Sequence, residues 1–173
     1  SGGGGGGSAP ASAAPAPAAI PTFDYRAPTA AELAQVRTDW SARDLAVRDA
    51  RIVAEGDGPG YHASIIQHAV GANIHFGAVI VPAGVTGRLP VLAVLDGLDQ
   101  SNPVMTLDWP LTLMRGNAIL VVPLYRGRTL RFNSQLYSAT GDFCDAYDGA
   151  ADDTIALLNV VAALTPQADM GRV

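Results

Sequence analysis

Two short apolar stretches decide the fold of this chain, Leu92-Ala-Val-Leu95 and Ala118-Ile-Leu-Val-Val122. Both consist wholly of apolar residues bounded by turn residues, which is typical of parallel strands covered on both faces. Parallel neighbours need a crossover connection. Between them Asp108 to Arg115 predicts a short helix, with Asp108 as N-cap, a proline in the first turn and Gly116 as the stop signal. We therefore expect the centre of a parallel sheet here.

The residues before these stretches predict two further strands. Gly56-Asp-Gly-Pro-Gly60 has the composition of a turn, and Tyr61 to Gln67 and Asn73 to Val81 are rich in β-branched residues and separated by Gly71. Adjacent strands with a short connection are expected, followed by a loop from Pro82 to Arg88.

An amphipathic helix is predicted after the second apolar stretch. Gly149 to Leu164 carries two aspartates in its first turn, where carboxylates suit the helix dipole, and Pro166 ends it. The residues expected on its buried face are Ile155, Leu158, Val161 and Ala162. The first residues of another strand follow, before Val173.

The amino-terminal residues form a different region. Ser1 to Pro21 is almost entirely Gly, Ala, Ser and Pro, so we expect a disordered tether over residues 1–22. Residues 23–57 are assigned to an accessory helix and linker, because Thr29 and Glu32 have the spacing of a capping box. The helix is expected from about Ala30 towards Asp44. Its apolar stripe, Leu33, Val36 and Trp40, is expected to pack on the domain formed by residues 58–173.

Composition restricts the class of protein. The chain has 173 residues, is 49% hydrophobic and carries a formal net charge of -5, which fits a globular domain and argues against nucleic acid as a partner. A single cysteine, Cys144, excludes an internal disulfide framework. No apolar run reaches the ~18–20 residues that a membrane span requires. The chain begins with serine, which indicates processing or trimming.

The Gly/Ser run at the start resembles the tether that follows the lipidated cysteine of a bacterial lipoprotein, although that cysteine is not in this sequence. An expression scar or a natural low-complexity linker is the alternative. The lipoprotein interpretation implies removal of a signal peptide and a location in the bacterial cell envelope, periplasmic or lipid-anchored, or secretion.

Three segments together resemble the α/β-hydrolase superfamily, within it the prolyl-oligopeptidase branch with its dipeptidyl-aminopeptidase and acylaminoacyl-peptidase relatives. They are Leu89-Pro-Val-Leu-Ala-Val-Leu-Asp-Gly-Leu98, Val122-Pro-Leu-Tyr-Arg-Gly127 and the acid-rich stretch from Gly141 to Asp153. The resemblance implies a doubly wound, mostly parallel α/β sheet, here reaching the strand before the nucleophile elbow. It covers about residues 61–173.

In that family the elbow G-x-S-x-G carries the nucleophile, and the acid and histidine follow it in chain order. The resemblance therefore implies that the whole catalytic triad lies beyond Val173, that this chain contains no catalytic residue and that it is inactive alone. It also implies that the backbone N–H groups of the Gly97-Leu98 turn help to form an oxyanion hole. The sequence has Asp96-Gly97 where relatives have His-Gly or Tyr-x-Gly, which favours an esterase-like substrate. No cofactor is implied.

Other side chains that could act as nucleophiles or metal ligands are interpreted as structural or surface residues. Cys144 has three acidic neighbours that would suppress its thiolate, and Ser101 and Ser138 lack the strand–turn–helix context of a nucleophile. His62, His68 and His75 form no metal-ligand pair, although His62 and His68 share a face if they lie in one strand. The acidic cluster Asp142, Asp145, Asp148, Asp152 and Asp153 lacks the EF-hand pattern. We expect it to pair with Arg126, Arg128 or Arg131, or to be solvated.

The sequence thus favours the amino-terminal half of a secreted or lipid-anchored bacterial serine hydrolase, a peptidase or esterase that transfers an acyl group from an ester or amide. Its partners would be a small-molecule or peptide substrate, a lipid anchor and the missing carboxyl-terminal half of the domain. The alternative is a non-catalytic envelope lipoprotein whose hydrolase-like domain binds a ligand or partner.

Overall fold

The computed structural model describes residues 26–97, 104–144 and 147–173. The chain divides into two compact units, with the boundary between Asp39 and Trp40. Helix α1 (Ala30–Ser41) begins with the expected capping box: the Thr29 backbone N–H donates to Glu32 Oε2 at 2.7 Å and the Glu32 N–H to Thr29 Oγ1 at 3.2 Å. The packing of its apolar stripe on the following unit stays a prediction, and the expected tether lies outside the described residues.

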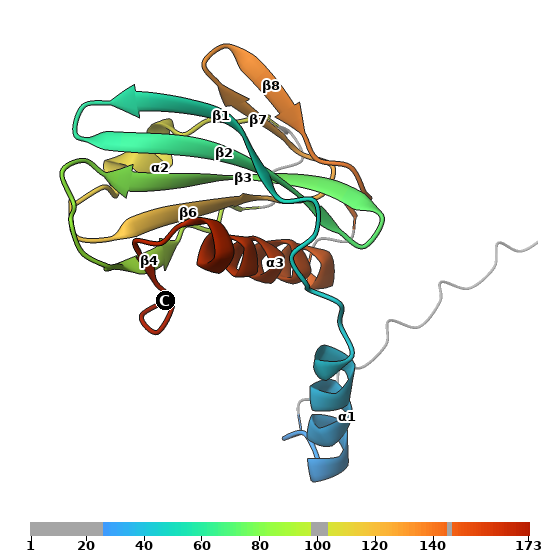
Figure 1. Ribbon diagram of the computed structural model, residues 1–173. Helices are drawn as coiled ribbons and strands as arrows, with labels where there is room; N and C mark the ends of the chain where they lie inside the picture. The colour runs from blue at the N-terminus through green and yellow to red at the C-terminus, as the bar shows by residue number, and fades with distance from the viewer. Residues whose placement is uncertain (1–25, 98–103, 145–146) are drawn as a thin grey trace, which may run out of the picture. The chain divides into compact units, whose positions relative to one another are not determined.

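The second unit is an α/β fold built on a six-stranded sheet with the order β1-β2-β3-β6-β4-β9. Figure 1 shows β1, β2, β3, β6 and β4 side by side in this order. The strands are β1 (Arg51–Gly58), β2 (Tyr61–Val70), β3 (Asn73–Pro82), β4 (Leu89–Ala93), β6 (Ile119–Leu124) and β9 (Ala168–Asp169). The first four in this spatial order pair antiparallel, and β4 pairs parallel with both β6 and β9. The sheet is therefore mixed, and the expectation of a mostly parallel sheet was wrong, because short turns join β1, β2 and β3.

Strand β1 was missed by the sequence prediction. Its last residues are Gly56, Asp57 and Gly58, which have the composition of a turn, but they pair in register with Ala63, His62 and Tyr61 of β2. The turn itself is confined to Pro59 and Gly60, and Gly60 adopts a φ of +80°.

The parallel part confirms the two apolar stretches as neighbouring central strands. Leu92 of β4 faces Leu120 of β6, and helix α2 (Asp108–Thr112) lies in the connection between them. Asp108 is in the first turn of α2, but the N-cap residue is Leu107 and no side chain caps this end. The expectation that Asp108 is the N-cap was wrong, since its carboxylate instead accepts a hydrogen bond from the Thr106 hydroxyl at 2.9 Å.

Two hydrophobic clusters cover opposite faces of the sheet, because alternate residues of a strand point to opposite faces. Ile65 and Ile80 belong to the cluster that includes residues of the α2 segment, and Ile66 and Val79 to the cluster formed with helix α3 (Asp148–Leu164). Figure 1 shows α3 lying along one face of the sheet.

The buried face of α3 differs from the expected one. Its buried residues are Gly149, Asp153, Ala156, Leu157, Val160 and Val161, whereas Ile155 and Leu158 are half-buried and Ala162 is exposed. The expected face left out Asp153, which is 1% exposed and lies on the buried face of the helix. Its carboxylate is bound by Arg126.

A second, three-stranded sheet has the order β5-β7-β8. Strand β5 (Val104–Met105) pairs parallel with β7 (Thr129–Phe132), and β7 forms a hairpin with β8 (Gln135–Ser138). The hairpin turn, Asn133 and Ser134, has positive φ at both residues, as a two-residue hairpin loop of type I′ requires. None of the described helices is long and apolar enough to cross a membrane.

Candidate functional site

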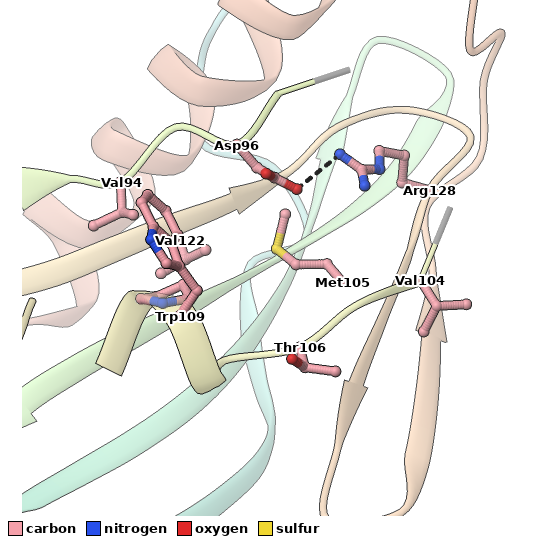
Figure 2. A pocket seen from close by; sticks show the side chains of 9 residues that line it. Val94, Asp96, Val104, Met105, Thr106, Trp109, Val122 and Arg128 are labelled. Atoms are coloured by element: carbon pink, nitrogen blue, oxygen red, sulfur yellow. Dashed lines mark hydrogen bonds and ion pairs between the residues drawn. The ribbon is translucent and has the colours of Figure 1, made fainter. Parts of the chain in front are cut away.

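A crevice lies beyond the carboxyl ends of the neighbouring strands β4 and β6. Helix α2, which follows β4, lies on one face of the sheet; the chain after β6 first forms β7 and β8 on that same face and then helix α3 on the other, so the two crossover helices lie on opposite faces. In open α/β sheets ligands bind outside the carboxyl ends of strands at such a switch point. The crevice has a volume of about 220 Å³ (Figure 2). It is lined by Val94, Asp96, Val104, Met105, Thr106, Trp109, Pro110, Val122 and Arg128.

The turn after β4 forms one wall of this crevice. The Val94 N–H donates to the Val121 carbonyl at 2.8 Å and extends the ladder with β6 beyond the end of β4. The Gly97 N–H then donates to Asp96 Oδ1 at 2.8 Å. Gly97, which was predicted as an oxyanion donor, thus lies at the switch point with its amide hydrogen-bonded to the carboxylate before it. Leu98, the other predicted donor, lies outside the described residues.

Arg128 forms the opposite wall and is 2% exposed. Its Nη1 donates to Asp96 Oδ2 at 3.0 Å and to the Gly97 carbonyl at 2.8 Å. Figure 2 shows the guanidinium directed at the Asp96 carboxylate. The buried Arg128 guanidinium therefore contacts both Asp96 and Gly97. These charge-assisted hydrogen bonds fix the conformation of the Asp96–Gly97 turn.

The turn that carries Arg128 is held from the other face of the sheet. The Asp153 carboxylate on α3 accepts three bonds from Arg126: from the backbone N–H at 2.9 Å, from Nε at 3.2 Å and from Nη2 at 2.7 Å. Gly127 between the two arginines has a φ of +73°, and an added Cβ would lie 3.0 Å from Phe143 Cβ. This confirms the expected pairing with Arg126 for Asp153 alone. Asp148 and Asp152 pair instead with Arg43, which was not singled out from the sequence, and Arg128 faces Asp96.

Two histidines are buried on the α3 face beside this ion pair. His68 of β2 is paired with His75 of β3, and their ring centroids are 5.9 Å apart. Burial, and then the charge of His75, lowers the pKa of His68 from 6.5 to about 4. His75 Nδ1 is 3.5 Å from Asp153 Oδ1. Burial lowers the pKa of His75 as well, against the attraction of Asp153. Both rings are therefore neutral at pH 7 and serve as packing groups.

Tyr125, at the end of β6, was not singled out from the sequence. It is 6% exposed, and burial, followed by the charge of Asp96, raises its pKa. Hydrogen bonds of the phenol with the Thr154 side chain and the Asp96 backbone lower this pKa and partly offset the rise. The phenol thus supports the turn after β4 from the α3 side.

Two further sequence candidates, Cys144 and Ser138, do not line the crevice. Cys144 is exposed, and its N–H donates to Asp142 Oδ1 at 2.8 Å. Ser138 is exposed in β8 and shares a hydrogen bond with Thr129 at 2.9 Å. Ser101 and Asp145 lie outside the described residues.

His62 lies on the same strand as His68, which confirms their common face. Its ring nitrogens contact Asp57 at 2.7 Å and Glu55 at 3.1 Å, and these contacts, that with Asp57 first, raise its pKa. Within residues 26–97, 104–144 and 147–173, no three His, Cys, Asp or Glu side chains are placed to hold a metal ion.

Among the described residues that line the crevice, none is a serine, cysteine or histidine. The arrangement supplies a backbone N–H donor, a neutralised Asp96–Arg128 pair and an apolar wall that includes Trp109. It can bind and polarise a small ligand. Comparison with known proteins found no family model and no curated protein that matches the chain.

Proposed function

We propose that this chain forms the amino-terminal part of the catalytic domain of a serine hydrolase of the α/β-hydrolase type, acting on an ester or amide by acyl transfer. The observation that carries the proposal is the position of β9. It lies beside β4, on the side opposite β6, and is reached through the acid-rich helix α3. In the α/β-hydrolase sheet the elbow strand has this place.

The direction of the chain after β9 supports the same assignment. Ala168 and Asp169 pair parallel with Leu89 and Pro90, and the Val91 N–H donates to the Arg172 carbonyl at 2.9 Å. A strand on this path runs along β4 towards the edge that carries the Asp96–Gly97 turn. A nucleophile at its end would lie next to the Gly97 amide, where an oxyanion donor is needed.

The catalytic groups and their order follow from this arrangement. A serine outside this sequence would attack the carbonyl, its proton would pass to a histidine base, and the Gly97 N–H, with that of Leu98, would bind the oxyanion. Because the oxyanion turn begins with Asp96 and contains no tyrosine up to Gly97, we favour an ester over a peptide. The protein would act in the bacterial cell envelope or outside the cell, with its amino-terminal tether attached to lipid.

A non-catalytic role remains the second candidate. The Gly97 amide is already hydrogen-bonded to Asp96, and the described lining of the crevice includes no serine, cysteine or histidine. These observations favour an envelope lipoprotein that uses the crevice to bind a ligand or partner.

Two substitutions at Gly97 separate the candidates. An added Cβ at this position meets no atom of the described residues within 4 Å. Gly97→Ala therefore keeps both the fold and the N–H, whereas Gly97→Pro removes the N–H. In the protein as its gene encodes it, we expect saturable hydrolysis of p-nitrophenyl butyrate, and Gly97→Pro should lower kcat by about 10²–10³ relative to Gly97→Ala.

Residues 1–173 alone should give no hydrolysis above background. No turnover by the encoded protein would favour the binding role. Turnover by residues 1–173 alone would place the nucleophile within them, and variants of Ser101, Ser138 and Cys144 to alanine would then identify it.

A further inference from the structure

The pairing of Asp96 with Arg128 creates a charge balance at the proposed oxyanion turn. The Asp96 carboxylate accepts from the Gly97 N–H through Oδ1 and from Arg128 through Oδ2. An unpaired carboxylate there would repel the negative charge that develops on a substrate oxygen. The turn can serve an oxyanion if its own negative charge is neutralised.

Arg128 is suited to this task by its burial and its two acceptors. The Arg128 side chain is 2% exposed, whereas the Asp96 side chain is 38% exposed. The guanidinium is therefore held by its surroundings, and the carboxylate is open to the crevice. Through Nη1, Arg128 also holds the Gly97 carbonyl at 2.8 Å. The peptide on both sides of Gly97 is thereby restrained by one side chain.

The position of Arg128 is in turn determined by the sheet and by α3. Its N–H donates to the Tyr125 carbonyl at 3.1 Å, and its carbonyl accepts from the Ala139 N–H at 2.9 Å. The preceding Arg126 is bound to the buried Asp153. The two arginines of the turn therefore bind acids on opposite faces, which links α3 to the turn after β4.

We propose that Arg128 is a positioning residue for the oxyanion turn, which it holds in place and whose Asp96 charge it neutralises. The catalytic part of this inference rests on the proposed function, and the structural part does not. The reacting group that the turn then accepts is one that gains negative charge, such as an acyl oxygen.

The structural part is tested by amide hydrogen exchange of Gly97, measured by NMR on the protein as its gene encodes it. Arg128→Met should accelerate this exchange by about tenfold or more, because the acceptor carboxylate loses its restraint. Arg131→Met is the matched control, since Arg131 is an exposed arginine of β7, and should leave the rate unchanged. Unchanged Gly97 exchange in Arg128→Met would overturn the positioning role, whatever the activity.

The charge balance is tested in the protein as its gene encodes it, with p-nitrophenyl butyrate. Arg128→Met should lower kcat by about tenfold with little change in KM, and Arg128→Met/Asp96→Asn, which removes both charges, should recover most of the loss. A double variant no more active than Arg128→Met would show that Arg128 does not act through the Asp96 charge. If the wild type has no activity, the proposed function fails, and the exchange measurement still decides the role of Arg128.

Discussion

Acidification should destabilise this protein through His68. The ring is 1% exposed, and its Nδ1 has no hydrogen-bond partner among the described residues. Burial holds its pKa at about 4, against 6.5 for an unperturbed histidine. Between these values the unfolded chain binds a proton that the folded chain excludes, so the free energy of unfolding falls as the pH falls. The loss from this residue is about 2 kcal/mol at pH 5 and about 3 kcal/mol at pH 4.

The assay is urea unfolding followed by circular dichroism between pH 7.5 and pH 4.5. His68→Leu removes the ionisable group and should flatten the dependence below pH 6.5. His62→Gln is the control of opposite sign: Asp57 and Glu55 raise the pKa of His62, so its contribution is present below pH 6.5 and is lost as the pH rises through the folded pKa. An equally steep acid dependence in His68→Leu, or an NMR titration of His68 near 6.5, would refute the reasoning.

Other substitutions test the packing of α3 on the sheet. Asp153→Asn should cost about 3 kcal/mol in urea unfolding, because it leaves the Arg126 guanidinium without its buried carboxylate, and a cost below about 1 kcal/mol would contradict the network. Gly77→Ala should cost about 1–3 kcal/mol, because the added Cβ would lie 2.3 Å from Leu157 Cδ2. Gly87→Ala meets no atom within 4 Å and should be neutral. Equal melting temperatures for the two alanine variants would contradict the packing described.

Short sequence patterns correctly predicted several helices and strands. The apolar stretches of β4 and β6, the β-branched strands β2 and β3 and the capping box of α1 all lie where the sequence indicates. Strand β1 was missed because Gly56 to Gly58 has turn composition, and its pairing with β2 outweighs that preference. The sheet direction was misjudged for a similar reason, since the tight turns around β2 were not weighed against the parallel centre.

The site was predictable in part. The resemblance placed Gly97 at the end of a central strand, and the structure has it at the switch point. Arg128 could not be assigned to Asp96, because the pair is separated by 32 residues and the expected partners were the nearer aspartates of the acidic cluster. The buried face of α3 was misjudged because a sequence pattern treats Asp153 as polar. The Asp153 carboxylate is bound by Arg126, and this pairing becomes apparent only when α3 is packed beside the end of β6.

We propose that β4, β6 and β9 belong to the nucleophile-bearing sheet of a serine hydrolase. The most direct measurement is labelling of the protein, as its gene encodes it, with a fluorophosphonate probe, followed by peptide mapping of the modified residue. We predict one labelled serine, located outside residues 1–173, with labelling prevented by prior denaturation. No labelled serine, or a label on a serine within residues 1–173, would contradict the assignment.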